Sequence, residues 1–395
     1  MLKGKTIIIG VTGSIAAYKI PNLARSLKKL GAQVQIIMTQ NAANFINPIT
    51  FESLLGTKCL IDTFDRNFEY SVEHVALAKR ADLFLVAPAS ANVIGKIANG
   101  IADDMLTTTI MACTCKKLIS PAMNHNMYHN PIVTDNINKL ESYGYEIIKP
   151  ETGMLANGDT GDGRMPSEDV LLQYVLKNIA KEKDLKGKKI LVTAGATRES
   201  IDPVRFITNH SSGKMGCAIA KAAMLRGADV TLIHGNMDIA CPLFVNEIPV
   251  TSAGDMFDAV TAVSKDFDII IKAAAVADYT PSEFSKEKIK KKDNGLSLSL
   301  EKTKDILKYL GENKTQNQIL CGFSMETENV LENSKKKLEN KNCDMICSNS
   351  IKNEGSGFGV DTNILTLITK KGFEELPLMS KEDAADIILS KLKEL

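Results

Sequence analysis

The sequence predicts an α/β protein made of two Rossmann-like domains in tandem, each built on a doubly wound parallel sheet. The first observation is an echo between the halves: residues 2–13 read LKGKTIIIGVTG, and residues 185–195 read LKGKKILVTAG. Each is a short β-branched run that ends in glycine, which is typical of a buried parallel strand entering a phosphate-type turn.

The second observation is that both halves continue in the same order. A helical segment follows each glycine turn, and a second strand is expected within residues 29–38 and 226–233. A third strand is expected within residues 81–90 and 267–278, and each runs into small residues that let a ligand approach closely. Ligands of doubly wound sheets bind beyond the carboxyl ends of the strands, so we expect one site in each half.

The boundary between the halves is predicted within residues 168–189, where an amphipathic helix gives way to the polar stretch KDLKGKK. We therefore expect domains at residues 1–185 and 186–395. The second domain ends in an antiparallel-looking segment and then a final helix for which Ser380 is the expected N-cap.

Composition narrows the class of protein. The 48 Lys and Arg nearly balance the 47 Asp and Glu, so nothing calls for a polyanionic partner such as duplex nucleic acid. No apolar run reaches the roughly 18 residues of a membrane span, and no signal peptide is recognised at the N-terminus. The eight cysteines form no CxxC pair, so a reduced cytoplasm is the expected compartment.

Two stretches of the first half suggest a ligand site. GVTGSIAAYK, at residues 10–19, is a strand-to-helix turn whose free N–H groups near Ser14 could attract phosphate, with a plain tight turn as the alternative. Residues 88–109 alternate small and hydroxylated side chains with amides such as Asn92, a pattern that favours a ligand-lined surface over an ordinary core helix.

PAMNHNMYHNP, at residues 121–131, contains two histidines four apart, His125 and His129. The zinc-protease pattern HExxH requires Glu after the first histidine, and Asn126 stands there, so we expect no metal ligands here. The useful side chains of this segment are expected to be Asn124, an amide able to bind a carboxylate, and Met127.

His74 precedes the third strand, where a neutral imidazole could take up a proton near pH 7, although a lone histidine is more often structural. Residues 151–167 contain four glycines and end near Arg164 and Met165. Their length within a compact unit favours a mobile flap over a site rather than an irregular loop.

Residues 1–180 resemble the flavin-containing cysteine decarboxylases through GSIAAYK, His74, PASAN, DDMLTT, PAMN with Met127, and the Gly-rich flap. The resemblance implies a flavodoxin-like flavoprotein domain in which His74 is the base and Asn124 holds the substrate carboxylate, with Asn92 and Met127 nearby. Oxidation of the substrate thiol by the flavin would create the electron sink that lets CO2 leave. The residues implied for FMN binding are Gly13, Ser14, Thr39, Ser90, Met105 and Thr107.

The flap departs from that family in one position. The family has L-A-C-G, with the cysteine as proton donor for the final reduction, whereas this sequence has Leu155-Ala156-Asn157-Gly158. An amide cannot serve as that acid. Three explanations are open: Asn157 is an engineered substitution, another donor acts, or the reductive half is impaired. Our hypothesis is that flavin binding and oxidation survive while amine formation is slow.

In the second half, residues 193–216 form a long polar insertion between strand and helix. Its helix start could cradle phosphates, although Thr208 replaces the first glycine of a Walker A loop, and a solvated loop is the alternative. The phosphate-suited groups in it are Arg198, Arg205, Asn209, Ser211, Ser212 and Gly213.

Three later features add charge beside this loop. Asp278 follows a strand and suits a ribose or base, and Lys288 lies in KEKIKKK, which suits a polyphosphate. Lys337 and Lys341 are four apart and share a helical face, where lysines are usually solvated but could clamp a phosphate beside a nucleotide site.

Residues 186–395 resemble the phosphopantothenate–cysteine ligases, and the order of the halves is similar to that of bacterial bifunctional coenzyme A biosynthesis proteins. The resemblance implies CTP and Mg2+: the carboxylate of 4′-phosphopantothenate attacks CTP, and the cysteine amine then displaces CMP from the acyl-cytidylate. Asn209 would bind this intermediate, and Lys288 would assist the second step. The residues implied for CTP and substrate binding are Arg205, Ser211, Ser212, Gly213, Lys272, Ala273, Ala274, Asp278, Lys304, Asp305, Ile306, Leu307, Phe323, Lys337 and Lys341.

The same resemblance implies trimeric flavin domains and dimeric ligase domains, and hence a dodecamer. A ligase fused to a regulatory or decarboxylation-impaired flavin-binding module is an alternative function, for which Asn157 is the main support. An NAD-dependent dehydrogenase is disfavoured because neither half contains G-x-G-x-x-G.

Overall fold

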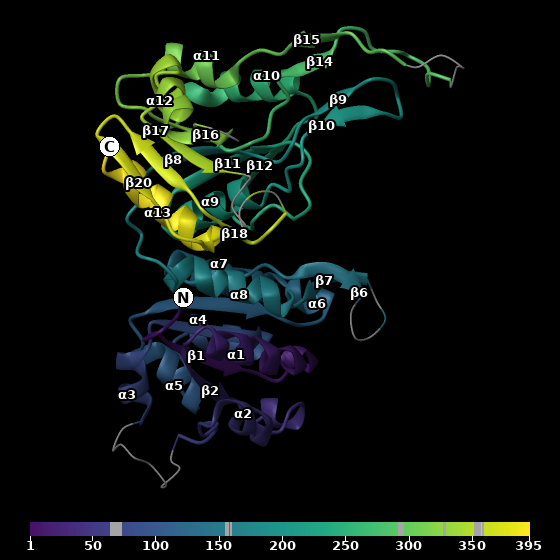
Figure 1. Ribbon diagram of the computed structural model, residues 1–395. Helices are drawn as coiled ribbons and strands as arrows, with labels where there is room; N and C mark the ends of the chain where they lie inside the picture. Colours follow the sequence, from purple (N-terminus) through teal and green to yellow (C-terminus); the bar gives the residue numbers. More distant parts are fainter. Residues whose placement is uncertain are drawn as a thin grey trace. The chain divides into compact units, whose positions relative to one another are not determined.

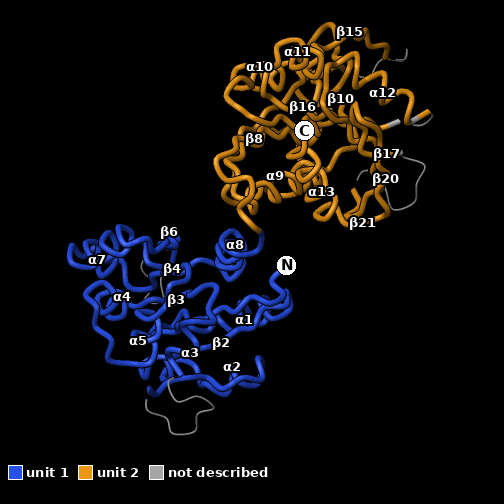
Figure 2. The backbone as a smooth tube through the Cα atoms, turned by 90° about the vertical axis from the view of Figure 1, so that its left-hand side faces the viewer, with its two compact units in different colours: residues 1–181 blue, residues 182–395 orange. Residues whose placement is uncertain are grey.

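The computed structural model describes residues 1–63, 73–154, 158, 160–290, 296–326, 329–350, 357 and 359–395. The chain forms two compact units, Met1–Lys181 and Glu182–Leu395 (Figure 2). Each unit is built around its own largely parallel sheet with helices packed against it (Figure 1). The predicted tandem α/β architecture is therefore confirmed.

The sheet of the first unit has five parallel strands in the order β2-β1-β3-β4-β5, the flavodoxin-like order with its switch point between β1 and β3. Ile7 of β1 pairs with Val34 on one side and Leu83 on the other. All seven residues of β3 are buried, as expected of a central parallel strand. The strands are β1 (Thr6–Val11), β2 (Gln33–Met38), β3 (Leu83–Ala89), β4 (Lys116–Pro121) and β5 (Glu146–Ile147).

Five helices of this unit, α2, α4, α5, α7 and α8, begin at a side-chain cap and bury apolar residues. An apolar cluster joins α3, α4, α5 and α7 to the side chains of Ile8, Phe84 and Ile119 on the sheet. α1 packs with α8, and an antiparallel hairpin of β6 (Glu151–Met154) and β7 (Thr160–Arg164) stands apart from the sheet. The helical segments are η1 (Ile15–Lys19), α1 (Ile20–Lys29), η2 (Ala42–Asn44), α2 (Pro48–Leu55), α3 (Glu73–Arg80), α4 (Ala91–Ala98), α5 (Met105–Ala112), α6 (His125–Tyr128), α7 (Pro131–Ser142) and α8 (Glu168–Ile179).

The sheet of the second unit has eight strands in the order β12-β11-β8-β13-β16-β17-β19-β20. The first six strands are parallel to one another. The next strand, β19, pairs antiparallel with β17, with Met345 opposite Thr369, and β20 pairs antiparallel with β19. This confirms the predicted antiparallel segment. The strands are β8 (Lys189–Ala194), β11 (Asp229–His234), β12 (Asn246–Pro249), β13 (Ile269–Lys272), β16 (Ile319–Glu326), β17 (Met345–Ser350), β19 (Thr366–Thr369) and β20 (Gly372–Glu375).

Helices cover this second sheet, and short two-stranded ribbons extend its loops. Ser380 caps the last helix by accepting a hydrogen bond from Asp383 N, as predicted, and that helix packs on α9. The helical segments are α9 (Lys214–Leu225), α10 (Ala253–Val263), η3 (Ser264–Asp266), α11 (Ile306–Glu312), α12 (Val330–Asn340) and α13 (Lys381–Lys393). The ribbons pair β9 (Arg198–Ser200) with β10 (Phe206–Thr208), β14 (Tyr279–Pro281) with β15 (Leu300–Lys302), and β18 (Thr362–Asn363) with β21 (Met379–Ser380).

The sequence echo has a structural counterpart. β1 lies between β2 and β3, and β8 lies between β11 and β13, so in each unit the first strand is flanked by the second and third strands of its repeat. The glycine turns after β1 and β8 therefore occupy equivalent positions in the two sheets. None of the helices in the described part of the chain has the length and apolarity of a membrane span.

Candidate functional sites in the two units

The first unit has a cavity of about 660 Å³ beyond the carboxyl ends of β1, β3 and β4. Three structural regions form it: the turn after β1, the start of α4, and the β6–β7 hairpin with α6. Its lining residues are Gly13, Ser14, Ile15, Ala16, Tyr18, Lys19, Ser90, Ala91, Ala122, Met123, Asn124, Met127, Met154, Gly163, Arg164 and Met165.

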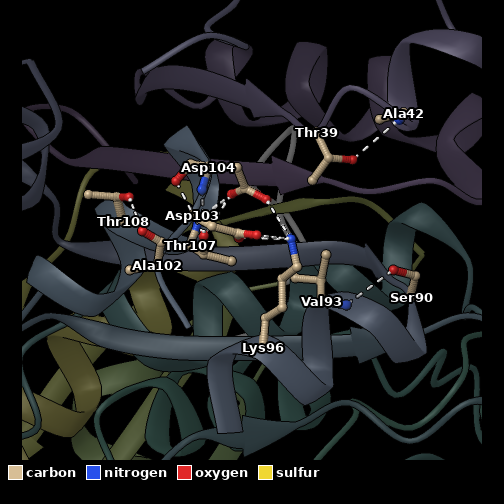
Figure 3. Close-up of polar contacts among 10 residues, drawn as sticks. All are labelled: Thr39, Ala42, Ser90, Val93, Lys96, Ala102, Asp103, Asp104, Thr107 and Thr108. Atoms are coloured by element: carbon tan, nitrogen blue, oxygen red, sulfur yellow. Dashed lines mark hydrogen bonds and ion pairs between the residues drawn. The ribbon is translucent and has the colours of Figure 1, made fainter. Parts of the chain in front are cut away.

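Hydrogen bonds fix one end of this cavity. Thr12 Oγ1 donates to Pro88 O at 2.7 Å and accepts from Ser90 N at 2.8 Å, which ties the turn after β1 to the start of α4. A Cβ at Gly13 would lie 2.8 Å from Asn41 Cβ, so only glycine allows this close approach. Ser14 caps the helical segment after β1, and Ser90 caps α4 (Figure 3 shows the Ser90 cap). Both turns present backbone N–H groups suited to a phosphate.

The rest of the lining is largely apolar and includes the methionines Met123, Met127, Met154 and Met165. Lys19 Nζ is buried and donates to Met165 O at 2.6 Å, and burial holds the pKa of Lys19 below its ordinary value. Arg164 is a second cation on the wall. A cavity of this size, apolar on most sides and polar at one end, fits a flat aromatic cofactor that carries a phosphate.

The β6–β7 hairpin is docked on the segment that carries Asn124. Met123 N donates to Gly163 O at 3.1 Å, and a Cβ at Gly163, whose φ is +129°, would lie 2.2 Å from Met123 O. Asn124 Oδ1 accepts from Asn126 N at 2.9 Å, so its amide nitrogen is the end that a carboxylate could reach. The hairpin and the predicted carboxylate-binding amide thus share one wall.

Several residues predicted for this site do not line the cavity within the chain. Thr39 is buried and accepts from Ala42 N at 3.3 Å, and Thr107 forms a capping box with Asp104 (Figure 3). Met105 is also buried. The remaining residues outside the lining are His74, which is half-buried on α3, and Asn92, which is exposed on α4. Asn157 lies outside the described residues.

The polar stretch at residues 88–109 partly serves helix capping rather than a ligand. Ser90 accepts from Val93 N at 3.4 Å, and Thr107 N donates to Asp104 Oδ1 at 2.8 Å. Lys96 Nζ pairs with Asp103 Oδ1 at 2.8 Å (Figure 3). Only Ser90 and Ala91 of this stretch line the cavity.

The second unit has two cavities that share a wall, beyond the carboxyl ends of β8, β13 and β16. The larger, about 490 Å³, is lined by Thr208, Asn209, His210, Ser211, Ser212, Gly213, Lys214, Met215, Gly216, Lys272, Ala273, Ala274, Ala275, Val276, Asp278, Phe323, Ser324, Met325, Lys337, Asn349, Gly357, Asn363 and Lys381. The smaller, about 360 Å³, is lined by Lys272, Val276, Ala277, Asp278, Tyr279, Lys302, Thr303, Lys304, Asp305, Ile306, Leu307, Lys337 and Lys341. The shared wall is Lys272, Val276, Asp278 and Lys337.

The start of α9 forms one side of the larger cavity. Gly213 precedes the helix with φ +78°, and a Cβ there would lie 2.6 Å from Met237 Cγ. Asn209 Nδ2 donates to Ala275 O at 3.2 Å, and Thr193 Oγ1 accepts from Ala274 N at 3.1 Å. These bonds bring the polar loop against the small residues after β13, as the sequence predicts.

Lysines dominate the shared wall and the smaller cavity. Burial lowers the pKa of Lys272 to about 8, and the nearby charge of Lys337 adds to this effect. Lys337 Nζ donates to Phe323 O at 2.9 Å, and Lys341 Nζ contacts Asp305 Oδ2 at 2.6 Å. The junction is therefore a place where an anionic group would be stabilised.

Three predicted residues lie outside both cavities. Arg198 stacks on Phe206, with its guanidinium carbon 4.5 Å from the ring centroid. Arg205 pairs with Asp202 and donates to Ile289 O at 2.8 Å, so it holds the loop rather than lining either cavity. Lys288, next to Ile289, is exposed. Lys381 lines the larger cavity, although the sequence did not predict it. Its Nζ donates to Gly357 O, a contact between distant segments that no local motif indicates.

The structure also brings Asp162 to the pair His125 and His129, with one potential ligand atom of each within 4.8 Å of the others. From the sequence we expect no metal at the two histidines. Asp162 enters only through the docking of the β6–β7 hairpin, which the sequence does not reveal.

Fold and sites together define a tandem α/β enzyme for small-molecule substrates, with a flavodoxin-like first domain and a lysine-rich second domain. A model of the Flavoprotein family matches residues 1–180, and one described as the DNA/pantothenate metabolism flavoprotein C-terminal domain matches residues 185–395. The chain belongs to the family of bifunctional coenzyme A biosynthesis proteins. It is a bifunctional enzyme with a flavoprotein decarboxylase domain and a ligase domain, as the sequence predicts.

Individual relatives match along the whole chain. A coenzyme A biosynthesis bifunctional protein of Bacillus subtilis is 47% identical over 399 residues, covering 100% of this chain and 98% of the relative. One of Escherichia coli is 39% identical over 394 residues, covering 99% of this chain and 97% of the relative. A solved C-terminal domain of such a protein is 45% identical, covering 54% of this chain and 97% of that chain, with a TM-score of 0.47.

Proposed function

We propose that the second unit uses CTP and Mg2+ to join cysteine to 4′-phosphopantothenate through an acyl-cytidylate, and that the first unit then decarboxylates 4′-phosphopantothenoylcysteine to 4′-phosphopantetheine with FMN. The observation that carries the proposal is the shared wall of Lys272, Asp278 and Lys337 between two cavities. A ligation of this kind needs two anionic substrates to meet at one point.

The smaller cavity is proposed to hold CTP and the larger one the phosphopantothenate. A free carboxylate resists nucleophiles, so it must first become a mixed anhydride with a phosphate. Lys272 and Lys337 at the junction would stabilise the charge on the phosphate under attack and on the departing pyrophosphate. The N–H groups at the start of α9 would receive the phosphate of phosphopantothenate, and Asn209 would contact the acyl-cytidylate.

Mg2+ would be held mainly by the CTP phosphates, since this ion commonly keeps its waters and takes few protein ligands. Lys288 is proposed to assist the attack of the cysteine amine. Its neighbour Ile289 is anchored on both sides, because Ile289 N donates to Asp202 Oδ2 at 3.1 Å and Ile289 O accepts from Arg205. Arg205 would thus act by holding the segment that carries Lys288.

In the first unit, Gly13, Ser14 and Ser90 would hold FMN at the phosphate-suited end of the cavity. The flavin would supply a two-electron acceptor for the substrate thiol. Asn124 would hold the substrate carboxylate through its amide nitrogen, and the docked hairpin would exclude water from the wall formed with Met127 and Met154.

His74, Thr39, Met105 and Thr107 lie away from the cavity of their own chain. His74, which is half-buried, is proposed to act on a flavin held by a neighbouring copy, in the trimer of flavin domains that the family resemblance implies. The buried Thr39, Met105 and Thr107 would support that surface from within their own chain. Ligase domains pairing as dimers would complete a dodecamer, which we propose to act in the cytoplasm. Sedimentation of the full chain would test this arrangement, and a stable monomer that retains flavin would contradict it.

Asn157 places the last step of the decarboxylase in question. We propose that thiol oxidation and CO2 release proceed, while the enethiol accumulates because an amide cannot donate the final proton. Asn157→Cys should then raise 4′-phosphopantetheine formation at least tenfold, because reduction of the enethiol also returns the flavin to its oxidised form. The CO2 released in the first turnover, one per flavin, should change little. Equal 4′-phosphopantetheine formation by both proteins would contradict this proposal.

One assay separates the whole proposal from its alternative, an active ligase with a regulatory flavin module. The full chain is given phosphopantothenate, cysteine and Mg2+ with CTP or ATP, and pyrophosphate, CO2 and thiol products are followed. Pyrophosphate release with CTP supports the ligase proposal, and release with ATP alone contradicts it. Phosphopantothenoylcysteine that accumulates without CO2, in protein that absorbs near 450 nm as flavins do, favours the regulatory module.

A further inference from the structure

A cluster of two histidines and one aspartate joins α6 to the β6–β7 hairpin. His125 begins α6, His129 follows its last residue, and Asp162 lies on β7. His129 N donates to His125 O at 3.0 Å, so the turn is closed as in an α-helix and the two imidazoles project from the same face. Their ring centroids are 4.4 Å apart.

The spacing of the side-chain atoms suits a small divalent cation. His129 Nε2 and Asp162 Oδ2 are 3.1 Å apart, and one potential ligand atom from each of the three side chains lies within 4.8 Å of the others. Tetrahedral zinc with bonds of about 2.0–2.1 Å separates its ligand atoms by roughly 3.4 Å. Small side-chain rotations would therefore complete a three-ligand site with a fourth position for water.

Neighbouring groups hold the three side chains in place. Thr152 Oγ1 donates to Asp162 Oδ1 at 2.5 Å, which turns Oδ2 toward His129. Asp162 N donates to His125 Nδ1 at 3.2 Å, so this nitrogen carries no proton, and an ion that bound there would displace this long hydrogen bond. A Cβ at Gly161 would lie 2.8 Å from the same nitrogen, so glycine is what lets the hairpin approach the imidazole. Such outer partners are typical of metal sites.

We propose that His125, His129 and Asp162 bind one divalent transition metal ion, with zinc as the best fit to two imidazoles and a carboxylate. The ion would replace the proton shared by His129 and Asp162 and would fasten the hairpin to α6. Both elements also line the cavity of the first unit, through Met154 and Gly163 on one side and Asn124 and Met127 on the other. The metal would thus brace this wall from behind.

The test uses the full, tag-free, flavin-loaded chain and Zn2+ alone, in equilibrium dialysis without nucleotide. One zinc per chain should bind, and His129→Ala and Asp162→Asn should each weaken its affinity at least tenfold. Thr152→Ala should weaken it by about tenfold through the freed carboxylate. His129 is 51% exposed, so its removal leaves the core untouched, and the melting temperature of each variant verifies the fold.

His234→Ala is the matched control, because His234 Nε2 also contacts a carboxylate, Glu247, at 2.8 Å but lacks a second histidine. Its zinc affinity should equal that of the unaltered chain. X-ray absorption should show only nitrogen and oxygen neighbours near 2.0–2.1 Å, and amide exchange in β6 and β7 should slow with zinc only when the cluster is intact. Sulfur neighbours near 2.3 Å, no bound zinc, or unchanged affinity in His129→Ala would overturn the proposal.

Discussion

The two units place their cavities at equivalent positions of similar sheets, yet they surround them with opposite chemistry. In the first unit the residues after β1 and β3 are mostly small, and methionines from later segments complete the lining together with Lys19 and Arg164. In the second unit the corresponding place beyond β8 and β13 is lined by Lys272 and Lys337. Topology therefore decides where a ligand binds, and the residues just after each strand decide what kind of ligand it is.

The largest effect is expected at the shared wall of the second unit, because only this unit depends on its charge. Lys272→Met removes a half-buried cation and leaves Lys337 as the remaining lysine of the shared wall, so pyrophosphate release should fall about 10²–10³-fold. Flavin absorbance and CO2 release from supplied phosphopantothenoylcysteine should stay unchanged. Lys336→Ala, on the exposed face of α12 and paired only with Glu332 among the described residues, is the control and should retain ligase activity.

A second test asks whether the units are separately stable. Arg226 is buried and forms paired hydrogen bonds with Asp184, at 2.9 and 2.6 Å, and these lower the pKa of Asp184. Arg226→Ala would leave Lys393, at 3.0 Å, as the remaining ion-pair partner of that carboxylate, and the lost hydrogen bonds should destabilise the second unit by about 2 kcal/mol. Calorimetry should show one transition moving down, while the transition that releases flavin keeps its temperature; a joint shift would contradict separate stability.

A third test concerns the hairpin of the first unit. Gly163→Ala places a Cβ against Met123 O and requires a strained φ, so the hairpin should lift from the Asn124 segment and CO2 release should fall about tenfold. Gly158→Ala is the matched control, since its φ is +87° but a Cβ there meets no atom of the described residues within 4 Å. Pyrophosphate release should be the same in both variants. Equal rates of CO2 release by Gly163→Ala and Gly158→Ala would mean that the docking of the hairpin does not contribute to the site.

The smallest effect is a dependence on pH in the second unit alone. Because burial lowers the pKa of Lys272 to about 8, the free protein loses this charge as the pH rises from 7 to 9. CTP affinity should therefore fall several-fold over that range, and binding near pH 8 should take up a proton because the bound phosphates favour the charged lysine. Calorimetry in buffers of different ionisation enthalpy measures the uptake, which Lys272→Met should abolish.

Much of the fold could be predicted because it rests on local signals. The repeated glycine turns and β-branched strands fix the order of strands in both units, and the residues that follow the strands directly, such as Ser14, Ser90 and Ala273, do line the cavities. Contacts between distant segments could not be predicted. Lys19 reaches the carbonyl of Met165, and Arg205 pairs with Asp202 instead of facing a cavity, for reasons that only the folded loops reveal.

The residues shared by the two cavities of the second unit have a pharmacological consequence. A single compound that filled both cavities would have its two halves joined across the common wall, so the second half would bind at high effective concentration. A substitution of Lys272 or Asp278 that weakened the binding of such a compound would also change the affinity for both natural ligands. A bisubstrate inhibitor built on this junction would thus leave the enzyme few routes to resistance.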